Sequence, residues 1–366
     1  MVDIYSYDFG ECFIKILIKL VRDGEPVTVR GYPTKELLSC HVTVANPYDI
    51  CYFFPFRRDN IFAKIAETLW VLAGRNDIKW LSYYLPRAYD FSDDGYSWRA
   101  AYGYRLRHWK FDDTGETFKE IDQLEYIYSK LYSNPTTRQA VISIWDPSKD
   151  NRDSKDIPCN NWLHFIKRRV GNQDFLHLNI AQRSADFFWG WSNINVFEWS
   201  ILLQMMSFWT DSAPGNMSWL VSSMHMYDRH FETADKIIDS FIPKVPKFHK
   251  YPKFSTPFKD LDYMLHKIFS AEALLRISNE IDYRPPRILT GDELLDTFFC
   301  MLAIFINFKR GASLDMLADI IADMDDTEYK YAAILHVARE RRDILTYDVG
   351  DSEMIDYITH VLDVEG

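Results

Sequence analysis

The residues that could carry out a reaction are concentrated between positions 156 and 227. Cys159 follows a proline, and Arg183 and Ser184 end a later apolar stretch, directly after Gln182. The thiolate is the nucleophilic form of cysteine, and a nearby arginine favours it because the positive charge stabilises the anion. The pattern predicts a cysteine nucleophile beside an anion-binding site.

Two strands and a helix are expected to position these residues. Strands are predicted over 162–168 and 175–181, on either side of a Gly171-Asn172 turn, and a helix is predicted from Asn195 towards Met206. His225 and Tyr227 occupy alternating positions. In a strand, both of their side chains would point to one face.

These motifs stand in a recognisable order along the chain: Pro-Cys, then Gln-Arg-Ser-x-Asp with a following Gly190, then His-x-Tyr. The order resembles thymidylate synthase and its relatives, the pyrimidine-nucleotide hydroxymethylases, over roughly residues 25–240. The resemblance implies an α/β fold, in which a large mixed sheet forms the interface of an obligate homodimer and helices surround it. It also implies a thymidylate synthase-like catalytic domain over 1–245, followed by a mostly helical C-terminal extension of unknown role over 246–366.

The resemblance implies a folate-dependent one-carbon transfer to C5 of a pyrimidine deoxynucleotide. Cys159 would add to C6 of the base, and C5 would then attack the methylene carbon of 5,10-methylenetetrahydrofolate. Glu67 lies in an amphipathic helix predicted over 60–73, where it would hold a water and move protons together with Tyr102. A salt-bridged structural glutamate is the alternative. Asn160 and Asp186 complete the expected catalytic set.

The resemblance implies that arginines from three parts of the chain contact the nucleotide phosphate. Arg183 is one, and Arg30, in a loop before the first strands, is another. Arg138, ahead of an apolar strand predicted over 140–145, would reach the phosphate site of the partner chain. An ordinary surface position is the alternative for both Arg30 and Arg138.

The base and sugar contacts also follow from the resemblance. The Asn195 amide offers a donor and an acceptor, which match O4 and N3-H of uracil. Asn193 is a rival because one residue is inserted here, and a helix N-cap is the other interpretation of Asn195. The expected substrate-binding set also contains Gln182, Ser184, which favours a deoxyribose, and the pair that would hold the sugar 3'-hydroxyl, His225 and Tyr227.

Three departures from the synthase pattern bear on the product. Asn160 and Asn161 stand where synthases have a histidine after the cysteine, Tyr89 replaces a tryptophan, and residues 363–366 do not resemble the apolar tail that closes on folate. All three favour addition of water, so dUMP is predicted to become 5-hydroxymethyl-dUMP. The alternatives are thymidylate synthesis, with hydride from the folate, and a catalytically inactive nucleotide-binding protein.

Composition limits the remaining possibilities. The 366 residues carry a formal charge of -11 with a pI near 5.4, which argues against duplex nucleic acid as a substrate. The five cysteines are scattered without metal-ligand spacing, so no metal site or disulfide framework is expected, and a reducing cytoplasm fits. A first helix is predicted over 1–24, and its lysines exclude a membrane span. Further helices are predicted over 260–277 and 291–309.

Overall fold

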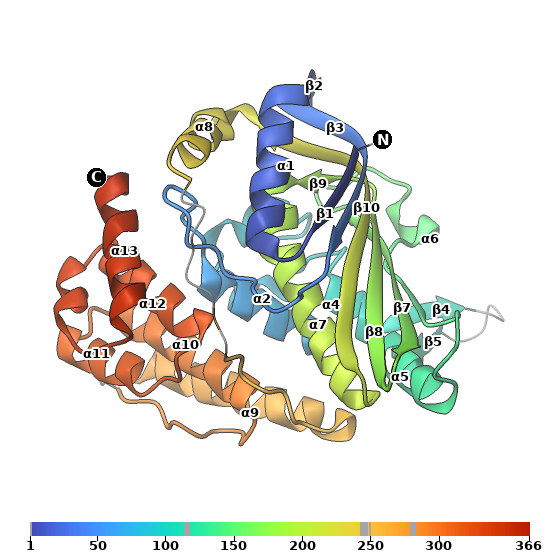
Figure 1. Ribbon diagram of the computed structural model, residues 1–366. Helices are drawn as coiled ribbons and strands as arrows, with labels where there is room; N and C mark the ends of the chain where they lie inside the picture. Colours follow the sequence, from blue (N-terminus) through green and yellow to red (C-terminus); the bar gives the residue numbers. More distant parts are fainter. Residues whose placement is uncertain (1, 113–117, 242–247, 249, 279–282) are drawn as a thin grey trace. The chain divides into compact units, whose positions relative to one another are not determined.

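The chain forms two compact units in the computed structural model, which describes residues 2–112, 118–241, 248, 250–278 and 283–366 (Figure 1). The first unit comprises Met1–Tyr48 and Ala66–Phe231, and the second comprises Asp49–Ile65 and Glu232–Gly366. The sheet and the residues predicted to be catalytic belong to the first unit.

A mixed sheet is the centre of the first unit. Its strands lie in the order β1-β3-β10-β8-β7-β6, with β2 paired to β3 and β9 paired to β10. The pairs β1/β3 and β10/β8 are parallel, whereas β3/β10 and β7/β8 are antiparallel. This sheet and its helices confirm the predicted α/β class. The strands are β1 (Val2–Ser6), β2 (Glu25–Val29), β3 (Tyr32–Val44), β6 (Val141–Ser143), β7 (Asn160–Val170), β8 (Gln173–Gln182), β9 (Ala185–Asp186) and β10 (Ala213–Tyr227).

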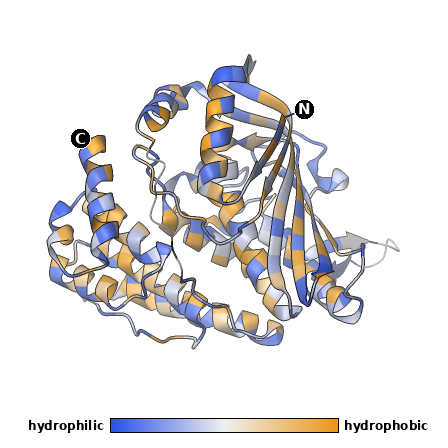
Figure 2. Ribbon diagram, viewed as in Figure 1, coloured by the Kyte–Doolittle hydropathy of each residue, from blue (hydrophilic) through white to orange (hydrophobic). Residues whose placement is uncertain are grey.

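One face of the sheet is the core of this unit. Figure 2 shows hydrophobic and hydrophilic residues alternating along its strands, as expected for a sheet with two different faces. Strand register places a continuous buried row on the inner face: Ile4, Val42, Trp219, Ile180, Leu163 and Ile142. Phe9 of helix α1 and Trp191 contact the Trp219 ring at centroid distances of 5.9 and 5.6 Å. These contacts place the covering helices on the buried face.

The helices of the first unit lie around this sheet (Figure 1). A π-helix over Phe187–Asn195 leads directly into α7, and a small second sheet pairs β4 with β5. The elements are α1 (Phe9–Asp23), α2 (Ile61–Leu72, which crosses the unit boundary), α3 (Ile78–Leu81), a 3₁₀ helix (Pro86–Phe91), α4 (Tyr102–Arg107), β4 (Trp109–Asp112), β5 (Phe118–Ile121), α5 (Gln123–Ser133), α6 (Pro147–Asp150), α7 (Val196–Trp209) and a 3₁₀ turn (Asp228–His230).

The helix predicted over residues 1–24 is wrong at its start. Val2–Ser6 form β1, which pairs in parallel with β3, and the helix begins only at Phe9. Asp8 determines that start because its carboxylate accepts a hydrogen bond from the Glu11 amide. The predicted strands over 162–168 and 175–181 are confirmed within β7 and β8, and the strand over 140–145 is shorter than expected.

The second unit is built from helices, and two buried carboxyl groups attach residues 49–65 to them. Glu328 Oε2 accepts hydrogen bonds from the backbone amides of Ile50 and Cys51, at 3.0 and 2.8 Å. Glu365 accepts one from Phe56 at 2.9 Å. The helices are α8 (Phe231–Asp239, starting at the boundary), a 3₁₀ turn (Phe258–Asp260), α9 (Leu261–Ile277), α10 (Glu293–Lys309), α11 (Leu314–Ala322), α12 (Glu328–Ala338), a 3₁₀ helix (Arg342–Thr346) and α13 (Ser352–Glu365). Helices α9 and α10 confirm the two predicted here.

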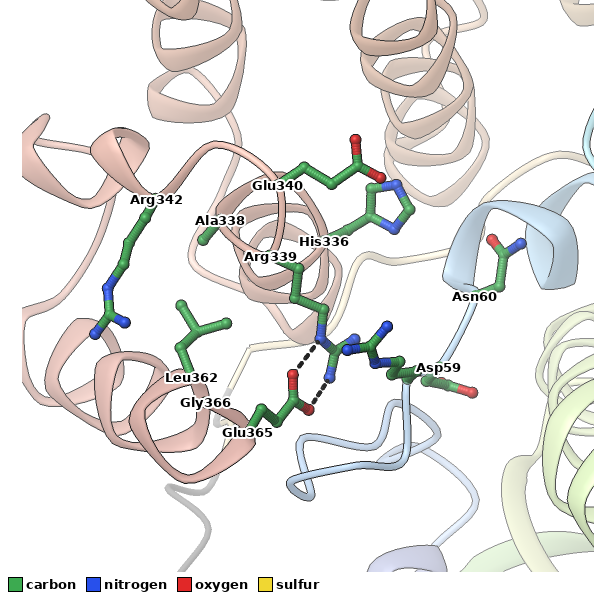
Figure 3. Close-up of a pocket in the computed structure, with 11 residues that line it drawn as sticks. Asp59, Asn60, His336, Ala338, Arg339, Glu340, Arg342, Leu362, Glu365 and Gly366 are labelled. Carbon is green, nitrogen blue, oxygen red and sulfur yellow. Dashed lines mark hydrogen bonds and ion pairs between the residues drawn. The ribbon is translucent and has the colours of Figure 1, made fainter. Parts of the chain in front are cut away.

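A cavity of about 510 Å³ opens in the second unit (Figure 3). Most charges in its wall are paired within the unit: Arg339 binds Glu365 at 2.8 Å, and Arg342 binds Asp363.

Within the described part of the chain, no helix is long and apolar enough to cross a membrane. The same residues contain no group of three or more His, Cys, Asp or Glu side chains placed to hold a metal ion.

Candidate active site

Pairing between β7 and β8 brings the predicted nucleophile to the arginine. Asn160 is opposite Gln182 in this antiparallel pair, so the residue before β7 meets the residues that follow β8. The backbone amide of Arg183 donates to the Cys159 carbonyl at 3.0 Å. Two motifs 24 residues apart in sequence are therefore neighbours in space.

Two donors point at the cysteine sulfur. Arg183 Nη2 and Ser184 Oγ each lie 3.8 Å from Cys159 Sγ. The guanidinium is held in place because it also donates to the carbonyl oxygens of Pro158 and Ile157, both at 2.8 Å. A cation and a hydroxyl thus face the atom that would carry negative charge as a nucleophile.

Tyr102 of α4 contacts the cysteine, and α4 packs against α2, the helix that carries Glu67. The Cys159 amide donates to the Tyr102 hydroxyl at 3.3 Å. The two helices lie close together at Gly103, where a Cβ atom would come within 2.2 Å of the Val71 carbonyl oxygen, so only glycine fits. This close packing explains the Tyr-Gly sequence.

The Glu67 carboxyl is nearly buried, and its environment favours the protonated form. Burial first, and the neighbouring Asp156 carboxyl second, raise the pKa of Glu67 to about 8. Burial likewise raises the pKa of Tyr102 well above its usual value. Near neutral pH, Glu67 can therefore give up a proton, as a general acid must.

Buried amides extend from the cysteine towards α7. Gln182 Nε2 donates to Asn160 Oδ1 at 2.9 Å and to Asn195 Oδ1 at 2.8 Å. Asn195 Nδ2 donates to Glu198 Oε1 at 2.8 Å, and Trp199 Nε1 donates to Asn160 Oδ1 at 3.2 Å. Further polar atoms here are buried without a hydrogen-bond partner among the described residues: Asn160 Nδ2, Gln182 Oε1, Asn193 Oδ1 and Glu198 Oε2. A bound ligand could satisfy such atoms.

The helix-capping interpretation of Asn195 is wrong, because its side chain makes no capping hydrogen bond at the start of α7. Its amide is used in the buried chain instead. The rival residue, Asn193, is also buried. Asn193 and Asn195 are therefore both candidates for the contact to the base.

The two residues expected to hold the sugar hydroxyl lie together on β10, beside Asp186 of β9. The His225 and Tyr227 rings are 5.3 Å apart, and Asp186 is the strand partner of His225. Asp186 caps the π-helix by accepting from the Phe188 and Trp189 amides, and it also pairs with Arg229 at 3.4 Å. These contacts give Asp186 a structural task in addition to the catalytic one predicted for it.

Arg30 and Arg138 are both exposed. Arg30 and Gly31 form the tip of the β2–β3 hairpin, with φ of 52° and 83°. The charge of Arg30 contributes, after burial and other charges, to the pKa of Tyr227, so the hairpin tip is near the sugar residues. Arg138 precedes β6, and no contact among the described residues joins it to Cys159. Tyr89, in the first 3₁₀ helix, is about half exposed.

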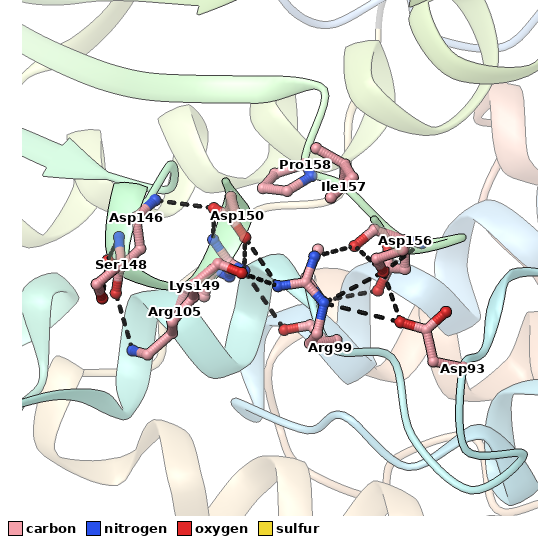
Figure 4. Close-up of polar contacts among 12 residues, drawn as sticks. Asp93, Arg99, Arg105, Asp146, Ser148, Lys149, Asp150, Asp156, Ile157 and Pro158 are labelled. Atoms are coloured by element: carbon pink, nitrogen blue, oxygen red, sulfur yellow. Dashed lines mark hydrogen bonds and ion pairs between the residues drawn. The ribbon is translucent and has the colours of Figure 1, made fainter. Parts of the chain in front are cut away.

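An ion-pair network holds the loop that precedes the cysteine (Figure 4). Arg99 donates to the Asp156 carbonyl oxygen at 2.6 Å and pairs with Asp150 at 3.0 Å. Arg105 makes two further bonds to Asp150, at 2.6 and 2.7 Å. The Asp156 carboxylate accepts from the Ala100 amide at 2.7 Å. The network was not predicted from the sequence, and it restrains the loop on which the nucleophile lies.

Glu198 and Trp199 were also missed. Glu198 is the one charged residue of α7 and is buried. A single acid within an otherwise apolar helix is a signal that the sequence did contain, because burying such a group unpaired is costly.

Comparison with known proteins agrees with this geometry. A family model described as thymidylate synthase matches residues 20–268. A deoxyuridylate hydroxymethyltransferase of Bacillus phage SP01 is 36% identical over 220 residues, covering 59% of this chain and 56% of the relative. Proteins of the same name from Delftia phage PhiW-14 and Pseudomonas phage M6 are 32% identical over 196 residues and 30% identical over 194. These two matches cover 50% and 53% of this chain, and 50% and 52% of the relatives. The chain thus spans about half the length of these relatives.

Proposed function

The chain belongs to the thymidylate synthase family, and on that basis we propose that it converts dUMP to 5-hydroxymethyl-dUMP with 5,10-methylenetetrahydrofolate as the one-carbon donor. The observation that carries the proposal is the Cys159 sulfur beside Arg183 and Ser184. The choice of substrate and product is supported by the three relatives named deoxyuridylate hydroxymethyltransferase.

Cys159 begins the proposed reaction by adding to C6 of uracil, which makes C5 nucleophilic. C5 then attacks the methylene carbon that the folate supplies. A protonated Glu67 suits such a donor, because an amine leaves more readily when it can take up a proton. Loss of the C5 proton, together with departure of the folate amine from the methylene carbon, then leaves an exocyclic methylene on the base.

Water decides the outcome at that methylene. If water adds there and the sulfur leaves C6, the product carries a hydroxymethyl group. The polar and buried Asn160, next to the nucleophile, favours a site that admits water. Hydride transfer from the folate to the same carbon would instead give thymidylate.

One assay distinguishes these outcomes. The protein is mixed with dUMP and methylenetetrahydrofolate, the folate is followed by absorbance, and the nucleotide is weighed by mass spectrometry. We expect tetrahydrofolate and a nucleotide heavier by one CH2O unit. Dihydrofolate with a methyl gain would replace the proposal with thymidylate synthesis. Failure to release tritium from C5-labelled dUMP would indicate an inactive nucleotide-binding protein.

A second copy of the chain is the proposed partner. The outer face of the sheet carries a row of facing residues that are exposed or half-buried: His41, Leu220, Ala181, Trp162 and Ser143. Leu220 is 52% exposed and Trp162 is 36% exposed, and exposed large apolar side chains that gather on one face can mark a protein interface. A hollow of about 390 Å³ lies on β6 and β7 beside Trp162. In a homodimer formed through this face, the exposed Arg138 of one chain could reach the phosphate site of the other chain.

We further propose that residues 1–245 form the catalytic domain and that residues 246–366 form a helical extension of unknown role. All five cysteines are free thiols, as is usual in a reducing compartment. We therefore place the reaction in the cytoplasm.

A further inference from the structure

Three buried carboxamides form a chain whose two ends contact consecutive residues of α7. Trp199 is at one end and Glu198 at the other. Asn160, Gln182 and Asn195 lie between them, and all three are at most 5% exposed. A carboxamide can turn over and exchange its donor and acceptor. The direction of the hydrogen bonds along these three amides therefore depends on whether the groups at the two ends can donate or accept.

The Trp199 end permits only one direction, because an indole N–H can donate but not accept. It donates to Asn160 Oδ1 at 3.2 Å, which fixes the Asn160 oxygen on that side. Gln182 must then approach that oxygen with its NH2 group, and does so at 2.9 Å.

The same direction passes on to Asn195. The Gln182 NH2 group also donates to Asn195 Oδ1 at 2.8 Å, so the Asn195 NH2 group is turned to Glu198 and donates to it at 2.8 Å. In this orientation, Asn195 has one N–H and one lone pair that the chain does not use. Those two match O4 and N3-H of uracil, whereas cytosine needs the opposite arrangement.

We propose that Trp199 is a specificity-determining residue, whose indole N–H sets the direction of the amide chain and so makes the site prefer uracil to cytosine. The inference rests on the proposed function, because Asn195 must be the residue that reads the base. Trp199 is a positioning residue and does not itself need to touch the nucleotide.

Reversing the chain would place like groups against each other. If Asn195 alone turned over, its NH2 group would face the Gln182 NH2 group. If all three amides turned, the Asn160 NH2 group would face the indole N–H.

The Glu198 end imposes no such restriction. Burial raises the pKa of Glu198 well above its usual value, followed by the charge of Glu67, and a neutral carboxyl can donate or accept. The fixed end is therefore the tryptophan.

The test compares two Trp→Phe substitutions in the same unit. Trp199→Phe removes the N–H but keeps a ring that can pack beside Tyr102, whose centroid is 5.8 Å from the indole. Trp219→Phe is the matched control, since Trp219 is also buried but its Nε1 has no hydrogen-bond partner in the described structure. The binding of dUMP and of dCMP is measured separately by calorimetry, without folate.

The wild type and Trp219→Phe should prefer dUMP equally. In Trp199→Phe, the preference should fall about tenfold, the effect of one hydrogen bond. Gln182→Glu gives an independent measurement, because an acceptor would replace the donor that faces Asn195, and its preference should fall in the same direction. Should Trp199→Phe fail to fold, the result for Gln182→Glu decides.

An unchanged preference in folded Trp199→Phe, or in Gln182→Glu, overturns the inference while leaving the proposed function in place. A wild type that binds neither nucleotide overturns the proposed function, and this inference with it. If Trp199→Phe weakens the binding of dUMP and of dCMP by the same factor, this also counts against the inference, because the ratio of the two affinities is then unchanged.

Discussion

At the scale of single residues, the motifs were enough to identify the cysteine site but not the groups around it. Cys159, Arg183 and Ser184 could be placed together because the two predicted strands are joined by a short turn. Glu198 and Trp199 could not, because their partners come from β7 and β8 and depend on strand register. A sequence pattern shows that a residue is buried more readily than it shows which residue it contacts.

The activity should depend on pH through Glu67. The pKa of Glu67 is about 8, raised by burial and by Asp156, so the acid form predominates at neutral pH and is lost as pH rises through 8. We expect kcat/KM to fall above that pH. Glu67→Gln should lower the rate by about 10²- to 10⁴-fold and remove this limb of the profile.

Thr68→Val is the control for Glu67→Gln, because Thr68 is buried on the same helix with no hydrogen-bond partner among the described residues. Its pH profile should match the wild type. A Glu67→Gln variant that kept the wild-type rate would assign Glu67 to structure alone.

Asn195→Asp should move the preference from dUMP towards dCMP. A carboxylate offers only acceptors, so it suits the amino group of cytosine and opposes O4 of uracil. The change concerns one or two hydrogen bonds, and we expect a shift of about 1–3 kcal/mol in the ratio of the two kcat/KM values. A ratio that does not move would direct the same substitution to Asn193.

At the scale of elements, long periodic segments were predictable and short ones were not. Helices α2, α9 and α10 follow from their apolar spacing. Strand β1 has only five residues, and pairing with β3, which is distant in sequence, determines its structure. Similarly, nothing in residues 49–65 indicates that they belong with the C-terminal helices, because the buried acid that holds them is almost 280 residues away.

Stability should depend on pH through that acid, Glu328. Burial raises the pKa of Glu328 to about 8, so the folded state keeps its proton between pH 4.5 and 8 while the unfolded state loses it. The contribution of protonated Glu328 to the stability of the folded state is complete below pH 4.5. It declines as the pH rises to 8, by as much as about 1.4 kcal/mol per pH unit.

Glu328→Gln tests this dependence because it keeps an oxygen that can accept from Ile50 and Cys51 but cannot ionise. Its free energy of unfolding should exceed that of the wild type at pH 8, and the difference should shrink towards pH 5. The measurement is urea unfolding followed by circular dichroism, since every tryptophan lies outside the second unit. A difference that is the same at both pH values would contradict the assignment.

At the scale of the whole molecule, the proposed homodimer would account for both the exposed arginine and the exposed apolar side chains on the sheet. Arg138 is exposed and makes no described contact with the Cys159 site, although the resemblance implies that it binds phosphate. Strand register shows that the outer face of the sheet carries Leu220 and Trp162, which are large and partly exposed. If two copies join through this face, each site can take its cysteine from one chain and Arg138 from the other.

Mixing two inactive variants tests that arrangement directly. Cys159→Ala lacks the nucleophile and should release no C5 proton, while Arg138→Ala should bind dUMP poorly. In a mixed dimer, one of the two sites would contain Cys159 from the Arg138→Ala chain and Arg138 from the Cys159→Ala chain, so it would be complete. We expect activity to appear when the two proteins are unfolded together and refolded as a mixture. At equal amounts, half of the dimers are mixed and each has one complete site, so about a quarter of wild-type activity should return.

Cys159→Ala mixed with a Cys159→Ala/Arg138→Ala double variant is the control and should remain inactive. If the two single variants also remain inactive when mixed, although sedimentation shows a dimer, Arg138 acts within its own chain or not at all.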